Sequence, residues 1–223
     1  MDNQQQKSFK TKIVDSQKMP GNARRITFDI STIKFSFIPG QYVWVVLPEL
    51  KYPDPKGNRR PFTICSFEDK ESFFIVFRMS DSGFKKTLDE MPAETVVEVQ
   101  GPFGYSTLPD SQQPLILLAG GTGIASYINM ARFAAETKDS RKIKLVYTSD
   151  KQENFLFLDK LKEFSQNNPN ITFVSHIGRL SKPDILKYAE ELPDTIWYIS
   201  GPEGMVNDIG KILLNEISIS RKN

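Results

Sequence analysis

The sequence is poor in the residues that bind metals and form disulfides. Among its 223 residues there is one cysteine, Cys65, and one histidine, His176. A single cysteine excludes an internal disulfide and a cysteine-held iron–sulfur cluster within this chain. A zinc site would also lack enough of its usual nitrogen and sulfur ligands. We therefore expect no metal site, and we expect the chemistry to come from a bound organic cofactor or from carboxylates.

Long apolar runs and a large excess of one charge are also missing. No stretch approaches about 20 consecutive apolar residues, so the sequence predicts no membrane span. Residues 1–10 are polar and lack the apolar core of a signal peptide, so we expect a cytoplasmic protein. The formal net charge is +2. No basic run is dense enough to follow a nucleic-acid backbone, so we expect no nucleic-acid partner.

The first half of the chain has the pattern of an all-β domain. Short runs rich in aromatic and β-branched residues are separated by Pro-Gly turns, and six of them at this spacing predict a small antiparallel barrel. A short helix is predicted at 84–90. The predicted strands are 9–16, 23–30, 41–47, 61–67, 72–78 and 95–100.

The second half alternates apolar strands with amphipathic helices, which predicts a parallel sheet with helices on both sides. We therefore predict two domains, an all-β barrel at 1–110 and an α/β nucleotide-binding domain at 111–223. The predicted strands are 115–119, 143–148, 171–177 and 195–200, and the predicted helices are 124–137, 155–164, 182–190 and 203–215.

One stretch of the barrel, 59–66, sets a cation, an aromatic ring and a hydroxyl within four residues. In a strand, Arg60 and Phe62 share one face and Thr63 points to the other. A flat cofactor that carries phosphate needs such a set: a guanidinium for the phosphate, a ring to stack on and a hydroxyl at the ring edge. This pattern predicts a flavin-binding strand.

Two glycine-containing turns follow predicted strands of the second domain. Residues 120–123, Gly-Gly-Thr-Gly, join the first strand to its helix, and Gly201-Pro202 follows the last strand. Glycines let backbone amides approach a pyrophosphate at a helix N-terminus. The first turn does not match G-x-G-x-x-G, because Ser126 occupies the last position. Ordinary tight turns between strand and helix are the alternative interpretation of both.

Taken together, these motifs resemble the ferredoxin–NADP reductase superfamily, in which a flavin barrel precedes a nicotinamide-dinucleotide domain. The resemblance implies a flavin-dependent NAD(P)H oxidoreductase, with FAD favoured over FMN, whose barrel site and dinucleotide site meet. The alternative is an electron-transfer module that serves a partner, such as a separate ferredoxin-like protein. The stretches that carry the resemblance are 60–63, 83–88, 101–104, 119–124 and 200–205.

The resemblance implies roles for the barrel residues one by one. Arg60 corresponds to the arginine that binds the flavin phosphate, and its neighbour Pro61 is also a candidate cofactor-binding residue. Phe62 replaces a tyrosine that packs on the isoalloxazine, and Thr63 replaces a serine near flavin N5, which makes these two the candidate catalytic residues. A barrel-core aromatic is the alternative for Phe62.

A second barrel stretch, 83–88, matches a phosphate-binding segment of the family. Its candidate residues are Gly83, Lys86 and Thr87. Lys86 stands where a serine is common, so contact with phosphate is expected from Thr87 or the backbone, or from Lys86 as a point charge. A solvated lysine is the alternative for Lys86.

The nucleotide-binding roles follow from the second domain. Gly120, Gly121, Thr122 and Gly123 correspond to the pyridine-nucleotide loop, and Gly201 and Pro202 correspond to a Cys-Gly-Pro turn. Ser200 replaces the cysteine of that turn, and because hydride transfer depends on proximity we expect activity to persist.

Asp150 stands where NADPH-using relatives carry an arginine, and an acidic side chain favours ribose hydroxyls over a 2′-phosphate. NADH is therefore slightly favoured, although Lys151 or Arg179 could serve NADPH. The chain stops at Asn223 without the family's aromatic tail, so we expect the flavin face to be open or covered by another chain.

Overall fold

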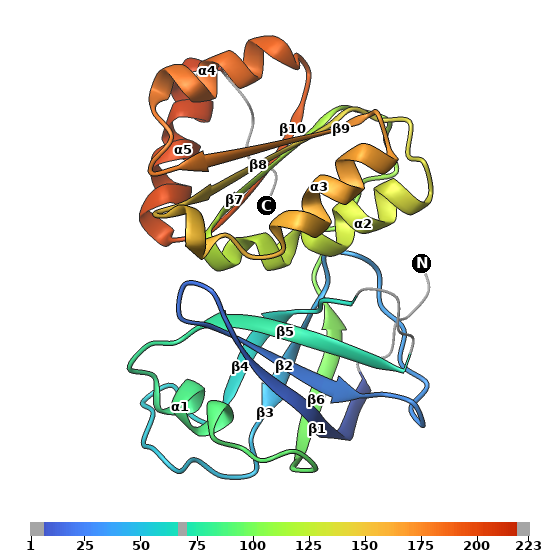
Figure 1. Cartoon of the computed structure of the whole chain (residues 1–223), viewed down its shortest axis with the longest axis vertical. Helices are drawn as coiled ribbons and strands as arrows, with labels where there is room; N and C mark the ends of the chain where they lie inside the picture. The colour runs from blue at the N-terminus through green and yellow to red at the C-terminus, as the bar shows by residue number, and fades with distance from the viewer. Residues whose placement is uncertain (1–6, 67–70, 218–223) are drawn as a thin grey trace. The chain divides into compact units, whose positions relative to one another are not determined.

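The computed structural model describes residues 7–66 and 71–217. The chain divides into two compact units, Met1–Leu108 and Pro109–Asn223 (Figure 1). Among the described residues, none of the helices combines the length and the apolar character that crossing a lipid bilayer would require.

The first unit is an antiparallel six-stranded sheet with the strand order β4-β3-β6-β1-β2-β5. The two outer members of this order are joined just beyond the end of β4, where Cys65 and Phe74 exchange two backbone hydrogen bonds of 2.8 Å. The sheet therefore closes into a barrel. Its elements are β1 (Lys7–Met19), β2 (Ala23–Asp29), β3 (Tyr42–Val46), β4 (Arg59–Thr63), β5 (Ser72–Arg78), α1 (Gly83–Asp89) and β6 (Val96–Phe103).

The register of β3 and β4 decides which side chains of the predicted flavin strand face the barrel core. Val43 and Val45 are fully buried, and they lie opposite Phe62 and Arg60. Directly opposed residues share a face, so Arg60 and Phe62 project toward the core side. Thr63 lies opposite Tyr42 and therefore points to the outer face. Helix α1 adds the fully buried side chains of Phe84 and Leu88 to the same core.

The second unit is a parallel four-stranded sheet with the order β10-β7-β8-β9. Its central strand β7 is buried along its whole length, as expected for a strand covered on both faces. Its elements are β7 (Leu115–Gly120), η1 (Gly121–Ser126), α2 (Ile128–Glu136), β8 (Ile143–Ser149), η2 (Gln152–Asn154), α3 (Leu158–Asn167), β9 (Ile171–Ile177), α4 (Lys182–Glu191), β10 (Ile196–Ser200) and α5 (Glu203–Glu216).

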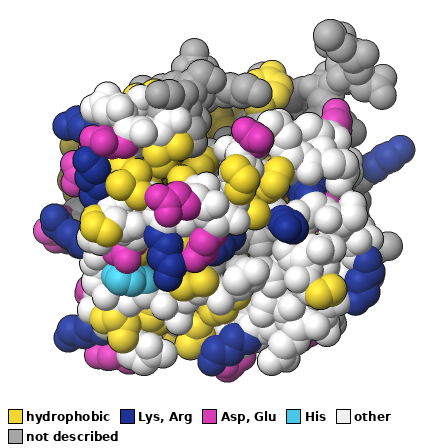
Figure 2. All heavy atoms as spheres, turned by 90° about the horizontal axis from the view of Figure 1, so that it is seen from above, with side chains coloured by type: hydrophobic (Ala, Val, Ile, Leu, Met, Phe, Trp, Pro, Cys, Tyr) yellow, Lys and Arg dark blue, Asp and Glu magenta, His cyan; other side chains and the backbone are white. Residues whose placement is uncertain are grey.

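Helices cover both faces of this sheet (Figure 1). On one face, Ile116, Leu118 and Val146 pack against α4 and α5 in a single apolar cluster that includes Ile185 and Leu213. Helices α2 and α3 contact each other and β9. On the face of the molecule drawn in Figure 2, acidic and basic side chains are interspersed among hydrophobic ones.

The predicted fold class, an antiparallel six-stranded barrel followed by a parallel-sheet domain, is confirmed, with local differences. The predicted helix 124–137 begins instead as the 3-10 helix Gly121–Ser126, and α2 starts at Ile128. The predicted helix 155–164 starts later, at Leu158, because Phe157 adopts a left-handed φ of 58°. The predicted strand 61–67 ends at Thr63, and its last residue lies outside the described ranges.

Candidate functional site

The two predicted nucleotide turns, although about 80 positions apart in the sequence, lie side by side. Strands β7 and β10 are parallel neighbours, with Ala119 opposite Ser200, so the turns that follow them leave the sheet at the same edge. A Cβ atom on Gly123 would overlap the carbonyl oxygen of Ser200, and one on Gly201 would lie 3.1 Å from the Cα of Gly120. Glycine at position 123 therefore lets the two turns pack against each other, and a side chain at position 201 would displace Met205 and crowd Gly120.

This edge is also the point where the order in which the chain adds strands to the sheet reverses. From β7 the chain proceeds to β8 and β9 on one side, and then returns to β10 on the other side of β7. Open α/β sheets bind nucleotides at such a switch point. At the switch point, the Oγ atoms of Ser126 and Ser200 lie 3.1 Å apart. Helix α5 starts at the same edge, after Pro202, and no side chain caps its N-terminus by a hydrogen bond.

Asp150 directly follows β8, on the same edge of the sheet. The pairing of β7 with β8 sets Gly120 opposite Thr148, two residues before Asp150. Its exposed carboxylate accepts a hydrogen bond of 2.9 Å from Asn154 Nδ2 and one of 3.3 Å from Ser149 Oγ. These bonds orient the carboxylate at the edge that also carries the glycine turns.

The two basic residues weighed against Asp150 are both exposed. Lys151 is its neighbour in sequence, and Arg179 follows β9. The backbone carbonyl oxygen of Arg179 lies 3.2 Å from Nε2 of His176. His176 therefore has a structural partner in this turn.

The guanidinium of Arg60 is held within the barrel unit. Its side chain is 15% exposed, and Nη2 is bonded to Oδ1 of Asp54, whose side chain is 3% exposed. Nη1 donates to the carbonyl oxygens of Lys56 at 2.8 Å, Gly57 at 3.1 Å and Arg59 at 2.6 Å. The predicted phosphate-binding arginine is thus surrounded by acceptors from its own loop.

Asp54 also binds the start of α1. Its Oδ2 atom accepts from Ser82 Oγ at 2.6 Å and from the Phe84 amide at 3.0 Å, while Oδ1 accepts from the Lys56 amide at 3.0 Å. The hydroxyl of Ser82 and the amide of Phe84 are the main reasons that the pKa of Asp54 lies far below its usual range. Sequence reasoning missed Asp54, because its proline-rich loop showed no sign of contacting α1.

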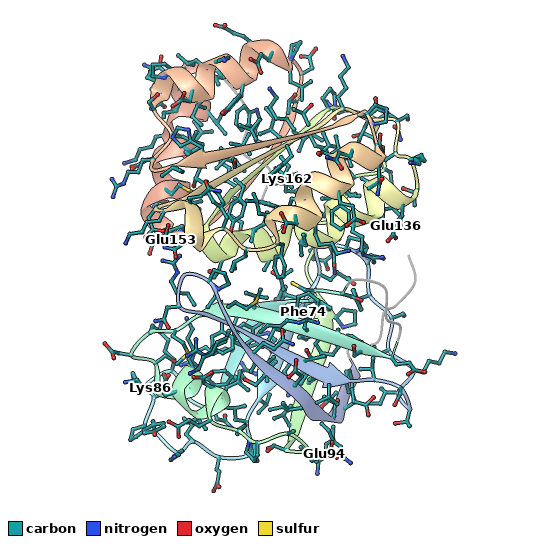
Figure 3. All side chains as sticks on the ribbon, in the orientation of Figure 1. Phe74, Lys86, Glu94, Glu136, Glu153 and Lys162 are labelled. Atoms are coloured by element: carbon teal, nitrogen blue, oxygen red, sulfur yellow. The ribbon has the colours of Figure 1, made fainter. Side chains whose placement is uncertain are left out.

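The second predicted phosphate stretch is engaged by the same loop. A Cβ atom on Gly83 would overlap the carbonyl oxygens of Tyr52 and Pro53. The hydroxyl of Thr87 is buried and accepts from the Tyr52 amide at 3.3 Å. Lys86, labelled on α1 in Figure 3, pairs with Asp81 at 3.2 Å. Each predicted group in this stretch therefore has a partner inside the chain.

Phe62 and Thr63 lie on opposite sides of the strand. The Phe62 side chain is 8% exposed, and its ring centroid lies 5.6 Å from that of Phe77 and 6.0 Å from that of Phe84. This position matches the core-aromatic alternative, and the stacking role of Phe62 stays a prediction. Pro61 is exposed on the opposite face from Phe62.

Thr63 is half-buried on the outer face of the barrel, in a row with two aromatic residues. Tyr42 lies opposite it on β3, and Phe103 lies opposite Tyr42 on β6. The centroids of the two rings are 5.6 Å apart. Sequence reasoning singled out the stretch that contains Phe103 but missed Tyr42, whose place beside Thr63 depends on strand register.

Comparison with known proteins adds sequence similarity to this geometry. The oxidoreductase NAD-binding domain family matches residues 117–211. The toluate 1,2-dioxygenase electron transfer component of Pseudomonas putida is 26% identical over 196 residues, 81% of this chain and 55% of that protein. Methane monooxygenase component C of Methylosinus trichosporium is 28% identical over 142 residues, 62% of this chain and 40% of that protein. The chain thus spans about half the length of these curated relatives.

Solved structures share the complete fold. The Plasmodium falciparum ferredoxin-NADP+ reductase has a TM-score of 0.77 at 19% identity, over 92% of this chain and 90% of that one. The Amycolatopsis cytochrome P450 reductase GcoB has a TM-score of 0.76 at 22% identity, over 93% of this chain and 65% of that one. Residues 117–211 thus match the oxidoreductase NAD-binding domain family, and the fold is shared with solved reductases.

Proposed function

We propose that the chain is a flavin-dependent NAD(P)H oxidoreductase that passes electrons from a nicotinamide nucleotide to an acceptor. The observation that carries the proposal is the packing of the two glycine turns at the switch point of the parallel sheet. This geometry lies within the region that the oxidoreductase NAD-binding family matches. A six-stranded barrel of the reductase type precedes it in the same chain.

The nicotinamide nucleotide would be held by the two turns. Backbone groups of Gly121, Thr122 and Gly123 would face its pyrophosphate, with Gly120, Gly201 and Pro202 forming the close turn contact that shapes the edge. Asp150 would accept hydrogen bonds from the ribose hydroxyls and repel a 2′-phosphate, which supports NADH over NADPH. Lys151 and Arg179 are the basic residues that would support NADPH instead.

The barrel residues fit the two ends of a flavin nucleotide differently. Thr63 presents a half-buried hydroxyl on the outer face beside Tyr42 and Phe103, which supports it as the residue at the flavin ring. Of the groups expected at the phosphate, Arg60 and Thr87 are already hydrogen-bonded within the chain, and Gly83 lies against backbone carbonyl oxygens. Lys86 forms an exposed pair with Asp81, and the set as a whole does not fit a phosphate as it stands. A flavin, when bound, accepts the nicotinamide hydride and releases electrons singly or in pairs.

The acceptor is proposed to be a separate redox protein. The similar proteins include, by name, an electron transfer component of a dioxygenase and a component of a monooxygenase, which supports a role beside a partner. With Cys65 as its one cysteine, this chain cannot hold a cysteine-ligated iron–sulfur cluster. A ferredoxin-like acceptor would therefore lie outside these 223 residues. A partner-dependent electron-transfer module is the second candidate function.

An absorbance spectrum of the protein mixed with flavin, followed by anaerobic titration with NADH and with NADPH, tests the proposal. We expect flavin to bind and its absorbance to be bleached at lower concentrations of NADH than of NADPH. A protein that binds no flavin would contradict the function, and preferential bleaching by NADPH would contradict the role of Asp150. Dye reduction by NADH in the absence of a partner separates a self-sufficient oxidoreductase from a partner-dependent module.

A further inference from the structure

The loop between β3 and β4 contacts the residues that the motif pattern assigns to a flavin phosphate. Its members Tyr52, Pro53 and Asp54 contact the groups that the motif pattern assigns to phosphate. Asp54 binds the guanidinium of Arg60, the Tyr52 amide donates to Thr87, and the Pro53 carbonyl oxygen lies against Gly83. The chain thus supplies its own anion and its own backbone contacts at these groups.

The Asp54 carboxylate is saturated with hydrogen bonds. Both of its oxygens accept two: Oδ1 from Arg60 and the Lys56 amide, and Oδ2 from Ser82 and the Phe84 amide. An ionised carboxylate offers about four acceptor positions, so all of them are in use. A bound phosphate would need the same kinds of hydrogen-bond donor: an arginine, a hydroxyl and backbone amides.

Two lysines of α1 are also engaged. The half-buried Lys85 donates its amine to the carbonyl oxygen of Arg78 at 2.8 Å, and Lys86 pairs with Asp81 at 3.2 Å. Burial, followed by the charge of Arg60, lowers the pKa of Lys85. The charge of Arg60 is balanced by the nearly buried Asp54, so a phosphate entering here would meet an arginine whose charge is already neutralised and a fixed carboxylate that is negatively charged, as the phosphate is.

We propose that Asp54 takes the position a flavin phosphate would need at Arg60, so that the chain recognises the isoalloxazine end of a flavin and gains no affinity from its phosphates. Riboflavin, FMN and FAD are then equivalent ligands. This inference rests on the proposed function, since it specifies which part of the flavin the barrel recognises.

The test is a fluorescence titration of the full chain with riboflavin, FMN and FAD at one ionic strength. We expect the three dissociation constants to agree within about threefold. FMN or FAD binding at least about tenfold more tightly than riboflavin would overturn the inference while leaving the proposed function intact. A chain that binds none of the three would overturn both. The two failures are therefore distinguishable.

A charge-removing variant tests whether Asp54 is the cause. Asp54→Asn keeps the shape of the side chain but frees the charge of Arg60, so FMN should gain about tenfold over riboflavin, in line with a charge-assisted hydrogen bond. Adding Arg60→Ala to this variant should abolish the gain. A folded Asp54→Asn protein that shows the wild-type ratio would overturn the role of Asp54.

Glu94→Gln is the matched control. Glu94 lies elsewhere on the barrel, where it forms an exposed pair with Lys12 (Figure 3). The substitution removes the same charge from the same unit, and the ratio of riboflavin to FMN affinity should not change. Circular dichroism shows whether each variant is folded, and the wild-type ratio decides the inference even if Asp54→Asn does not fold.

Discussion

The ring of Phe62 packs beside Phe77 and Phe84 in the barrel core, and this position determines what its replacement should do. Phe62→Ala should lower the free energy of unfolding by about 3–5 kcal/mol, the usual cost of deleting a buried aromatic side chain. Phe62→Leu keeps most of the volume and should cost about 1 kcal/mol. Urea denaturation followed by circular dichroism measures both effects.

The leucine variant separates packing from stacking, because it fills the core without presenting a ring. If Phe62 acts by packing, Phe62→Leu should bind flavin nearly as well as the wild type. A large loss of flavin affinity in this variant, with the unfolding free energy nearly unchanged, would instead support the stacking role that the motif pattern predicts.

Asp54 should make the barrel sensitive to acid. Its hydrogen bonds from Ser82 and the Phe84 amide hold its folded pKa well below the unfolded value of about 3.9. A depressed pKa gives stability that is present above the unfolded pKa and is lost as the pH falls toward the folded pKa. The thermal midpoint should therefore drop between about pH 5 and pH 2, and Asp54→Asn should be less stable at pH 6 but show a shallower drop. Equal slopes for the two proteins would contradict this assignment.

Asp150 should set the preference between NADH and NADPH. Its carboxylate is oriented by Asn154 and Ser149 at the edge that carries the glycine turns. Asp150→Asn removes the charge that would repel a 2′-phosphate, so the ratio of kcat/KM for NADPH to that for NADH should rise about tenfold. Asp208→Asn, an exposed acid on α5, is the control. An unchanged ratio in Asp150→Asn would shift attention to Lys151 and Arg179.

At the scale of the elements, the contact between the turns after β7 and β10 predicts how a glycine substitution should affect stability and NADH binding. Gly123→Ala would push its Cβ into the Ser200 carbonyl, a backbone atom that cannot rotate away. We expect a loss of about 1–3 kcal/mol in stability and at least about tenfold weaker NADH binding. Gly210→Ala on α5 meets open space, so it should raise stability by about 0.5–1 kcal/mol and leave NADH binding unchanged. Calorimetry and NADH titration distinguish the two.

Strands and helices were predictable where a local pattern decides them. The bounds of the predicted strands 72–78 and 171–177 match those of β5 and β9, residue for residue. Helix α3 starts later than its apolar spacing suggests, because Phe155 is drawn against Tyr147, with ring centroids 4.8 Å apart, before the left-handed Phe157. That displacement depends on a tertiary contact, which no short window of sequence contains.

Local pattern also found the residues of the candidate site but not their partners. The run 60–63 identifies a cation, a ring and a hydroxyl, yet which side faces the core is set by the pairing of β4 with Val43 and Val45. Asp54 reaches Ser82 and Phe84 across 28 and 30 positions of sequence. Contacts of this range form only when the chain folds, so the motif indicated what Arg60 could bind and not what it does bind.

At the scale of the whole molecule, each unit has a core of its own. The barrel core runs from Ile13 to Val99, and the α4–α5 side of the parallel sheet is filled from Ile116 to Leu213. A unit with its own buried apolar core can fold independently. We therefore predict that residues 1–108 and 109–223, produced as separate proteins, each show a cooperative thermal transition.

Each separated unit should also bind one of the two ligands. Residues 1–108 should bind flavin without NADH, and residues 109–223 should bind NADH without flavin, because the candidate residues for each lie within one unit. Mixing the two at micromolar concentration should give little flavin reduction, since linkage in one chain supplies an effective concentration in the millimolar range. Isothermal titration and anaerobic absorbance measure these properties. Loss of flavin binding by a folded 1–108 unit would mean that the flavin needs residues beyond the barrel, and would contradict the assignment of its site to β4 and its neighbours.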